Sequence, residues 1–327
     1  MTVTIGVVGC GKIAEKHFSA YQKLDNVEIV ATDVDESMAA KVTRMGFEWA
    51  DDPHALIDGD RVDAIDVCTP VSTHADIILR ALATDKDVFC EKPLATSVED
   101  VEAIYEATRE TENTLMVGYL YRYHPAFEFA RDALFNEIIG DPYYAIFRVG
   151  GRGSASTWKH RASDGGGAGN EMLVHMLDLI TWFFGDFDLV DTLHSDVLLE
   201  EREIDGEQVT ATAEDVMLLQ LQAGRDVEVI CQSDLVTPSY MNYVEIQGTN
   251  GTIWTTILDY FPTFVYCKEP RGIFDRGHNF REFDRVDLFE RELGHFVDCV
   301  TSETDLPWDA AADSLRIRNV LDEARTP

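Results

Sequence analysis

The chain has 327 residues, which is more than one ordinary hydrophobic core holds, so we expect two domains. Sixty acidic residues against 27 basic ones give a net charge of -33, which argues against nucleic acid or an anionic membrane surface as a partner. The sequence has no signal-peptide pattern and no apolar run near the roughly 20 residues that cross a bilayer. We therefore expect a cytoplasmic protein.

Two features of the composition concern the environment of the protein. Only eight of the 27 basic residues are lysines, and together with the carboxylate excess this predicts a halophilic protein, adapted to a salt-rich cytoplasm that screens the repulsion. An ordinary acidic surface is the alternative. The six cysteines are scattered without a CxxC pair, so they indicate neither a zinc signature nor a disulfide framework.

Short apolar runs alternate with helical patterns along the first 120 residues, as in βαβ units on a parallel sheet. The predicted strands are Val3 to Val8, Val27 to Thr32, Val62 to Cys68, Val88 to Cys90 and Leu115 to Gly118. Helical patterns near Glu36 to Arg44 and from Thr73 to Ala83 lie between them. The layout predicts an α/β fold with a doubly wound parallel sheet of the Rossmann type.

The pattern changes after Arg122 and predicts an α+β domain with an open, mainly antiparallel sheet. An amphipathic helix from Pro125 to Ile139 and an apolar helix from about Asn170 to Phe184 precede several strand-like runs between Leu189 and Cys267. Two helices, from about 288 to 300 and from 310 to 324, finish the chain. The predicted domains are residues 1–122 and residues 123–327.

A glycine-rich turn follows the first strand. Gly9 to Ala14 reads G-x-G-x-x-A at the start of the first predicted helix, where glycines let the backbone approach a pyrophosphate and the helix N-terminus favours its charge. Asp33 ends the second strand, where a carboxylate can accept hydrogen bonds from the adenosine ribose and repels a 2′-phosphate. The turn predicts a dinucleotide cofactor, NAD rather than NADP.

Three further segments, together with the glycine turn, carry a family resemblance. Asp63 to Pro70, Cys90 to Leu94 with its Glu-Lys-Pro core, Gly118 to Pro125 and the glycine turn resemble the Gfo/Idh/MocA oxidoreductases, the family of glucose-fructose oxidoreductase and inositol dehydrogenase. The resemblance implies that the first domain binds NAD and that a cis peptide precedes Pro93. The cofactor-binding residues predicted from the motif and the resemblance are Gly9, Gly11, Lys12, Ile13, Asp33, Thr69, Pro70, His74, Glu91 and Lys92.

Lys92 is a candidate catalytic residue. It lies just beyond the carboxyl end of a strand, the edge where open α/β sheets bind ligands, and its ammonium group can stabilise a developing alkoxide. The family resemblance implies the same role, close to the nicotinamide.

A second candidate group lies in the apolar helix. Glu171, His175 and Asp178 have the spacing to share one helical face, and a carboxylate one turn before an imidazole can orient it as a general base. The family pattern has Asp-x-x-x-His here, so Glu171 departs from it by one methylene. Metal binding by Glu171 and His175 is an alternative, but no HExxH motif supports it, and we expect no metal.

These residues predict an enzyme that transfers a hydride between NAD and a secondary hydroxyl of a sugar, sugar derivative or cyclitol, in the cleft between the domains. The predicted substrate-binding residues are Tyr119, Arg122, Trp158, Arg161, Asn170 and Asp178. The alternatives are an NADP-preferring reductase, a lyase-like enzyme with transient redox by bound NAD, and a non-enzymatic nucleotide sensor. By resemblance, we expect a homodimer or homotetramer that associates through the second domain.

Overall fold

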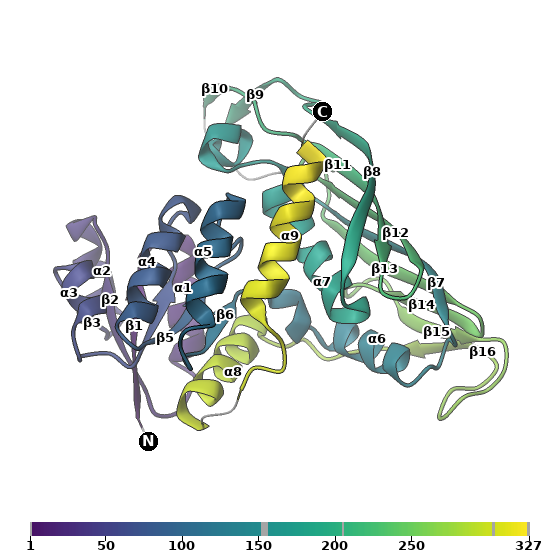
Figure 1. Cartoon of the computed structure of the whole chain (residues 1–327), viewed down its shortest axis with the longest axis horizontal. Helices are drawn as coiled ribbons and strands as arrows, with labels where there is room; N and C mark the ends of the chain where they lie inside the picture. Colours follow the sequence, from purple (N-terminus) through teal and green to yellow (C-terminus); the bar gives the residue numbers. More distant parts are fainter. Residues whose placement is uncertain (1, 152–155, 205, 303–304, 326–327) are drawn as a thin grey trace. The chain divides into compact units, whose positions relative to one another are not determined.

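The computed structural model describes residues 2–151, 156–204, 206–302 and 305–325. The chain forms two compact units, one of Met1–Leu120 with Val286–Arg318 and one of Tyr121–Arg285 with Asn319–Pro327 (Figure 1). The first division lies close to the predicted boundary at residue 122, but the units are not continuous in sequence because a C-terminal segment returns to the first unit. Every described helix is too short or too polar to serve as a membrane span.

The first unit contains a six-stranded parallel sheet in the order β3-β2-β1-β4-β5-β6. Its strands are β1 (Val3–Val8), β2 (Val27–Thr32), β3 (Glu48–Trp49), β4 (Ala64–Val67), β5 (Asp87–Cys90) and β6 (Leu115–Val117). The helices are α1 (Lys12–Tyr21), α2 (Ala39–Arg44), α3 (Pro53–Asp58), α4 (His74–Ala83), α5 (Val98–Thr108) and α8 (Leu288–Ser302). The predicted Rossmann sheet is confirmed.

Two local features of the first unit follow directly from its sequence. Ser97 caps α5, since its side chain accepts a hydrogen bond from the N–H of Asp100, as the spacing indicates. The strand order reverses between β1 and β4, so the loops after these two strands leave in opposite directions at the carboxyl ends, the place where open α/β sheets bind ligands. This edge carries the glycine turn.

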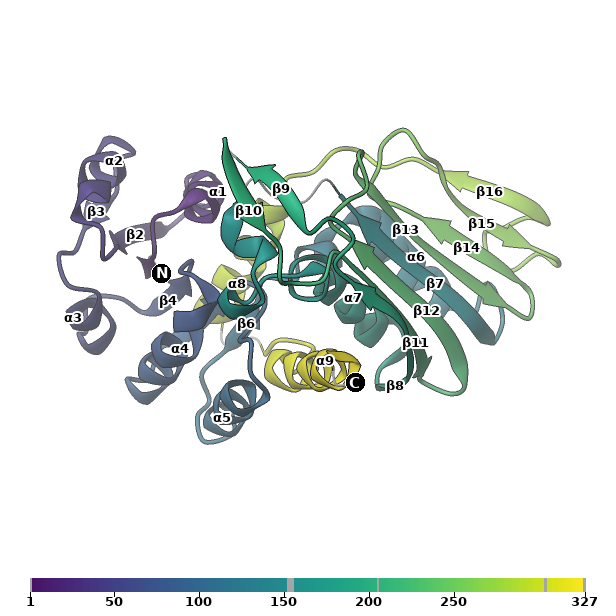
Figure 2. The same cartoon turned by 90° about the horizontal axis from the view of Figure 1, so that it is seen from above.

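The second unit is built on an eight-stranded mixed sheet in the order β16-β15-β14-β13-β7-β12-β11-β8, in which only β7 and β12 pair in parallel. Its strands are β7 (Pro142–Gly150), β8 (Phe187–Asp196), β11 (Val216–Ala223), β12 (Val227–Asp234), β13 (Met241–Gly248), β14 (Gly251–Thr255), β15 (Thr263–Cys267) and β16 (Gly277–Arg281). Helices α6 (Pro125–Phe135) and α7 (Val174–Phe184) cover one face (Figures 1 and 2). The predicted open, mostly antiparallel sheet is confirmed.

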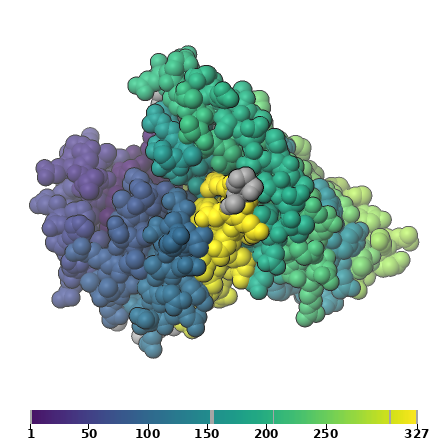
Figure 3. Space-filling model, turned by 45° about the horizontal axis from the view of Figure 1, so that its top comes forward, coloured from purple at the N-terminus to yellow at the C-terminus, as the bar shows by residue number. Residues whose placement is uncertain are grey.

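Burial alternates along these strands. In β13, for example, Val244 and Ile246 are buried toward the helices, whereas Tyr243 and Glu245 are half-buried on the opposite face. Figure 3 shows residues of the second unit in teal to light green. A separate hairpin, β9 (Glu201–Ile204) with β10 (Glu207–Thr210), follows β8, and α9 (Ala310–Arg325) closes the described chain.

The apolar helix predicted from Asn170 departs from the expected geometry. Its first turn, Gly169–Leu173, is π-helical, and regular α-helix begins only at Val174. The helix ends at Gly185, which has a positive φ of 82°, as the sequence indicates. A π-helical turn changes the angular spacing of side chains and is frequent at functional sites. Glu171 therefore lies in the π-helical turn and His175 in the α-helix that follows, and their common face stays a prediction.

Candidate functional site

The glycine turn joins β1 to α1 in a conformation that Gly9 makes possible. Gly9 has a φ of 93°, and a Cβ atom there would lie 2.8 Å from the backbone carbon of Cys68. At Gly11, by contrast, a Cβ atom would meet no heavy atom within 4 Å, so this side of the turn is open. Lys12 and Ile13 begin α1. The N-cap residue of this helix is Gly11, which has no side chain to accept a hydrogen bond from the first N–H groups. An open, uncapped helix N-terminus fits a pyrophosphate.

Asp33 is held beside this turn by two backbone groups. Its Oδ2 atom accepts a hydrogen bond of 2.7 Å from the N–H of Cys10, and its Oδ1 atom accepts one of 2.9 Å from the N–H of Asp35. The carboxylate is thus fixed at the carboxyl end of β2, where the sequence placed the ribose-binding acid. Burial and the neighbouring Asp33 raise the pKa of the Cys10 thiol to about 12, so Cys10 is a neutral part of the turn.

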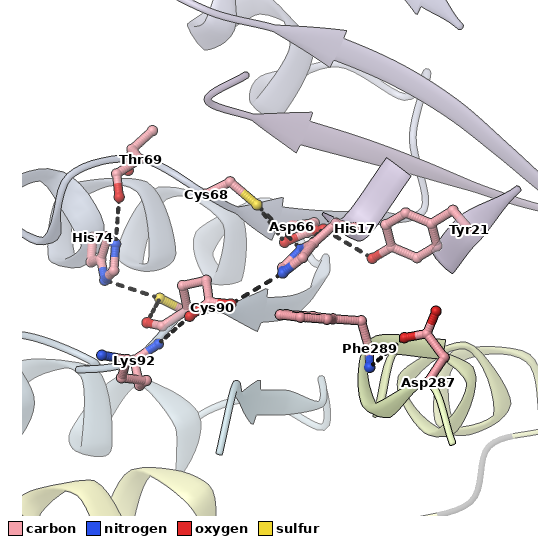
Figure 4. Close-up of polar contacts among 11 residues, drawn as sticks. His17, Tyr21, Asp66, Cys68, Thr69, His74, Cys90, Lys92, Asp287 and Phe289 are labelled. Atoms are coloured by element: carbon pink, nitrogen blue, oxygen red, sulfur yellow. Dashed lines mark hydrogen bonds and ion pairs between the residues drawn. The ribbon is translucent and has the colours of Figure 1, made fainter. Parts of the chain in front are cut away.

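The other cofactor candidates of the first unit lie after β4 and β5. Thr69 and Pro70 follow β4, and the buried ring of His74 has Nε2 3.0 Å from the Thr69 carbonyl oxygen and Nδ1 3.0 Å from the Pro93 carbonyl oxygen. Burial lowers the pKa of His74 despite these contacts, so the neutral ring is favoured at neutral pH. His74 thereby links the two loops at the carboxyl edge of the sheet (Figure 4).

Lys92 is half-buried directly after β5, and the peptide between it and Pro93 is cis, as predicted. The preceding residue, Glu91, accepts a hydrogen bond of 3.2 Å from the Lys92 N–H through Oε2. Glu91 and Lys92 therefore share the edge that also carries the glycine turn and Thr69. A cation at this edge can stabilise negative charge that develops on a bound oxygen.

In the second unit, His175 occupies the first turn of α7 and is half-buried. Its ring packs against the ring of Tyr121, with centroids 4.7 Å apart and planes inclined by 35°. The Tyr121 hydroxyl in turn forms a hydrogen bond with the Tyr240 hydroxyl. Burial, together with the adjacent Tyr240, raises the pKa of Tyr121 well above its usual value, so Tyr121 stays neutral.

Glu171 lies in the π-helical turn and forms an ion pair with Lys159. The Glu171 side chain is 8% exposed and that of Lys159 is 26% exposed, so the pair is shielded on the carboxylate side. Lys159 also lies 5.2 Å from the ring centroid of Trp158. The structure thus places a cation beside the predicted catalytic carboxylate that the sequence analysis did not assign, because the two residues are 12 positions apart in different elements.

Arg122 and Asp178, both predicted to bind substrate, form an ion pair with each other. The Arg122 Nε and Nη2 atoms donate to Asp178 Oδ1 at 3.0 and 2.6 Å, and the two side chains are only 2% and 1% exposed. This pair connects the segment before α6 to the middle of α7. Burial to this degree indicates a positioning role, and direct contact of either residue with substrate stays a prediction.

The remaining predicted substrate residues are dispersed. Tyr119 belongs to the first unit, is buried, and lies with its hydroxyl 3.2 Å from Ser314 Oγ. Trp158 is 40% exposed, and Arg161 is exposed with a loose ion pair to Asp164. Asn170 is buried and donates to the Gly165 carbonyl oxygen at 3.0 Å. Of these, Trp158 lies against Lys159 of the Lys159–Glu171 pair.

His17, outside the predicted site residues, is fully buried. It lies in α1 between the carboxylates of Asp66 in β4 and Glu91 after β5 (Figure 4). The one sequence signal for this group is an acid, Asp66, inside the otherwise apolar strand Ala64–Val67. The six cysteines are all free and buried, as expected.

Family models match both parts of the chain. Residues 3–119 match the Gfo/Idh/MocA model described as an oxidoreductase family with an NAD-binding Rossmann fold, and residues 127–254 match the C-terminal domain model of the same family. The matches confirm the predicted family, its NAD-binding domain and its oxidoreductase class.

Individual relatives extend over most of the chain. A myo-inositol 2-dehydrogenase of Thermotoga maritima is 29% identical over 304 residues, which cover 91% of this chain and 88% of the relative. An inositol 2-dehydrogenase of Acidothermus cellulolyticus is 32% identical over 262 residues, covering 77% and 72%. The solved structure of a levoglucosan dehydrogenase in complex with NADH has a TM-score of 0.89 at 20% identity, covering 99% of this chain and 97% of that one, which is a likeness of fold.

Proposed function

Since the chain belongs to the Gfo/Idh/MocA oxidoreductase family, we propose that it is an NAD-dependent dehydrogenase of a secondary hydroxyl in a cyclitol, a sugar or a sugar derivative. The observation that supports the proposal is the carboxyl edge of the first sheet, at which the strands before the glycine turn, Asp33 and Lys92 all end. The inositol dehydrogenases among the relatives support the substrate class.

The residues of this chain divide the chemistry in the proposal. Bound NAD supplies the hydride acceptor. Gly9 and Gly11 admit its pyrophosphate to the start of α1, and Asp33 accepts hydrogen bonds from its ribose. Lys92 stabilises the negative charge that develops on the substrate oxygen, and His175 removes the hydroxyl proton.

Glu171 has a modified role in this proposal. Because its carboxylate is paired with Lys159, we assign it to the shape and charge of the substrate pocket rather than to a simple Asp-His dyad. Tyr121, neutral and packed on the imidazole, orients His175 instead. Trp158 and Arg161, both exposed, remain the proposed contacts with substrate hydroxyls, together with Tyr119, Arg122, Asn170 and Asp178.

A turnover screen tests the proposal. The purified protein is incubated with NAD and a panel containing myo-inositol, scyllo-inositol, levoglucosan and common aldoses, and formation of NADH is followed by absorbance. We expect turnover of at least one compound, a loss of about 10²–10⁴-fold in kcat for His175→Ala, and unchanged NAD affinity in that variant. Failure of every compound with both NAD and NADP would favour a nucleotide-sensing protein, and activity only with NADP would overturn the assignment of Asp33.

Self-association is a further part of the proposal. Aromatic rings form a row along the face of the second sheet that lies opposite α6 and α7. Tyr243 stacks on Trp254 with ring centroids 6.0 Å apart, and Trp254 stacks on Phe264 with centroids 6.1 Å apart. Phe264 also contacts Phe280, which is 57% exposed. An aromatic surface of this kind supports association with a second copy of the chain. Light scattering should give a dimer or tetramer, and Trp254→Glu should lower the mass. A monomeric wild-type protein would contradict this part.

A further inference from the structure

A buried polar cluster lies beneath the carboxyl edge of the first sheet, outside the residues assigned so far to the reaction. At its centre, the fully buried His17 has Nδ1 2.8 Å from Asp66 Oδ2 and Nε2 3.1 Å from Glu91 Oε1. Tyr21 donates a hydrogen bond of 3.0 Å to the same Asp66 oxygen, and the Cys68 thiol lies 3.4 Å from Asp66 Oδ1. Figure 4 shows the ring of His17 with these groups around it.

The partners of His17 determine its protonation state. Both ring nitrogens face carboxylate oxygens, and a carboxylate only accepts hydrogen bonds, so both contacts are satisfied only when both nitrogens carry a proton. Burial alone would lower the pKa of His17, but the charge of Asp66 and the hydrogen bond to it outweigh burial and raise the pKa well above the usual value. The geometry and the raised pKa together favour an imidazolium beside the two carboxylates.

The geometry is that of a hydrogen-bonded cluster rather than of a metal centre. The ligand atoms of His17, Asp66 and Cys68 lie within 4.8 Å of one another. However, Nδ1 of His17 and Oδ2 of Asp66 are only 2.8 Å apart. Two ligands held at about 2.0–2.1 Å from a tetrahedral zinc ion stand farther apart than that, so an ion would have to break the contact that holds the cluster together.

Glu91 connects His17 to Lys92 through its two carboxylate oxygens. Its Oε1 atom contacts His17, and its Oε2 atom accepts the N–H of Lys92 at 3.2 Å. The Glu91 backbone N–H donates to the Val67 carbonyl oxygen at 3.1 Å, and a Cβ atom at Gly118 would lie 3.5 Å from Glu91 Cδ. The carboxylate is therefore enclosed, and its orientation depends on the two donors at its ends.

We propose that His17 is a positioning residue for Lys92: the imidazolium fixes the Glu91 carboxylate, and the carboxylate fixes the peptide from which the Lys92 side chain extends. The inference rests on the proposed role of Lys92 in the reaction. Helix α1 then has two roles. Its N-terminus lies beside the glycine turn, and His17, about a turn and a half later, positions Lys92. His74 completes the support from the opposite side, since its ring lies against the Pro93 carbonyl oxygen.

Two substitutions at His17 separate its two hydrogen bonds. An asparagine amide lies about where Nδ1 lies in histidine, so His17→Asn keeps a donor for Asp66 and removes the one for Glu91. A glutamine amide reaches about the position of Nε2, so His17→Gln keeps the donor for Glu91. We expect kcat to fall by about 10²-fold in His17→Asn, as displacement of a catalytic group by about 1 Å predicts, and to recover at least tenfold of that loss in His17→Gln.

The control is His54→Asn, the same change at an exposed histidine of α3 in the same unit, and kcat should equal the wild-type value. The NAD dissociation constant should stay within about twofold in all three variants, because the glycine turn and Asp33 are untouched. An equal loss of kcat in His17→Asn and His17→Gln, or a loss of NAD affinity that parallels the loss of kcat, would overturn the inference and indicate a purely structural role.

A double-mutant cycle with Glu91→Gln tests whether His17 acts through Glu91. An amide can accept at only one of the two positions that the carboxylate fills, so Glu91→Gln alone should lower kcat. If His17 acts through Glu91, the kcat of the double variant His17→Asn with Glu91→Gln lies within about twofold of the kcat of the less active single variant. Losses that multiply would overturn the proposal. Should His17→Asn fail to fold, the comparison of Glu91→Gln, His17→Gln and the wild type carries the same test.

A readout without turnover keeps this inference separate from the proposed function. The eight lysines are dimethylated with carbon-13, and the Lys92 signal is identified by its absence in Lys92→Arg. In the NAD-bound protein, we expect the Lys92 signal to move in His17→Asn, to return toward its wild-type position in His17→Gln and to stay in His54→Asn. A Lys92 signal unmoved in His17→Asn would refute the positioning role even if the enzyme turns over an inositol, whereas a moved signal would support it even if every substrate fails.

Discussion

The ion pair of Arg122 with Asp178 gives the sharpest prediction of stability. Both side chains are almost completely buried, and the guanidinium donates to the carboxylate through two nitrogens. Asp178→Asn keeps the shape and removes the negative charge, which for a buried pair costs roughly 3–5 kcal/mol. In a domain of 150–250 residues each kcal/mol shifts Tm by about 2–4 °C, so we expect Tm to fall by about 6–20 °C.

Differential scanning calorimetry of the purified variants measures this shift. The matched control is Asp259→Asn, which removes a carboxylate from the exposed pair with Arg285 in the same unit and should change Tm by less than about 4 °C. Replacing the buried pair together, Arg122→Met with Asp178→Leu, should recover much of the lost stability, since no buried charge is left without its counter-ion. Equal shifts for Asp178→Asn and Asp259→Asn would refute the reasoning.

The other predictions concern the cofactor, salt and pH. Asp33→Ser should raise the NADP:NAD ratio of kcat/KM at least tenfold, because a carboxylate that repels the 2′-phosphate is lost; an unchanged ratio would remove Asp33 from the ribose site. Raising KCl from about 0.1 M to about 1 M shortens the screening length from about 10 Å to about 3 Å and should raise Tm, given the charge of -33, whereas full stability at low salt would contradict the halophilic assignment. The pKa of His17 is raised on folding, so its stabilisation is fully present below the unfolded value of about 6.5 and is lost as the pH rises through the folded value. The difference in unfolding free energy between wild type and His17→Asn, measured in urea, should therefore be larger at about pH 6 than at about pH 9; a difference that grows with pH would show that the ring is neutral.

The sequence predicts which segments lie at the carboxyl edge of the first sheet because its signals are local. The glycine turn, Asp33 and the Glu91–Pro93 segment each lie at the end of a strand whose apolar run is unambiguous, and the parallel sheet brings strand ends to one edge. What a parallel sheet does not specify from sequence is which side chains meet beneath that edge.

The buried cluster illustrates this limit. His17 meets Asp66 and Glu91 across 49 and 74 positions of sequence, and a histidine in an amphipathic helix has the same pattern whether it is exposed or buried. Nor does any local signal place α8 in the first unit, where it packs against α1 and its Phe289 ring lies 5.7 Å from that of His17. Such contacts follow from tertiary packing and not from periodicity.

The second unit was harder to predict because its polar strands lack a clear apolar alternation. β8 is exposed at most positions after Phe187, and β16 combines aromatic and polar residues, so neither has the signature of a half-buried strand. The sequence also carried no signal for the π-helical turn at Gly169–Leu173. Spacing alone favoured an α-helical stripe, and the glycines before Asn170 marked only where the helix begins.

Each candidate catalytic group is therefore held by neutral or compensated partners from its own unit. In the first unit, Glu91 accepts a hydrogen bond from the Lys92 N–H and contacts His17, which we propose as the positioning residue. In the second unit, the ring of His175 packs against Tyr121. The Arg122–Asp178 ion pair holds the helix that carries His175. Since each support is internal to one unit, substitutions in one should leave the local order of the other intact. Measurements of NAD affinity and of the stability of each unit can thus assign a loss of turnover to the surroundings of Lys92 or to those of His175. This assignment does not require the natural substrate to be known.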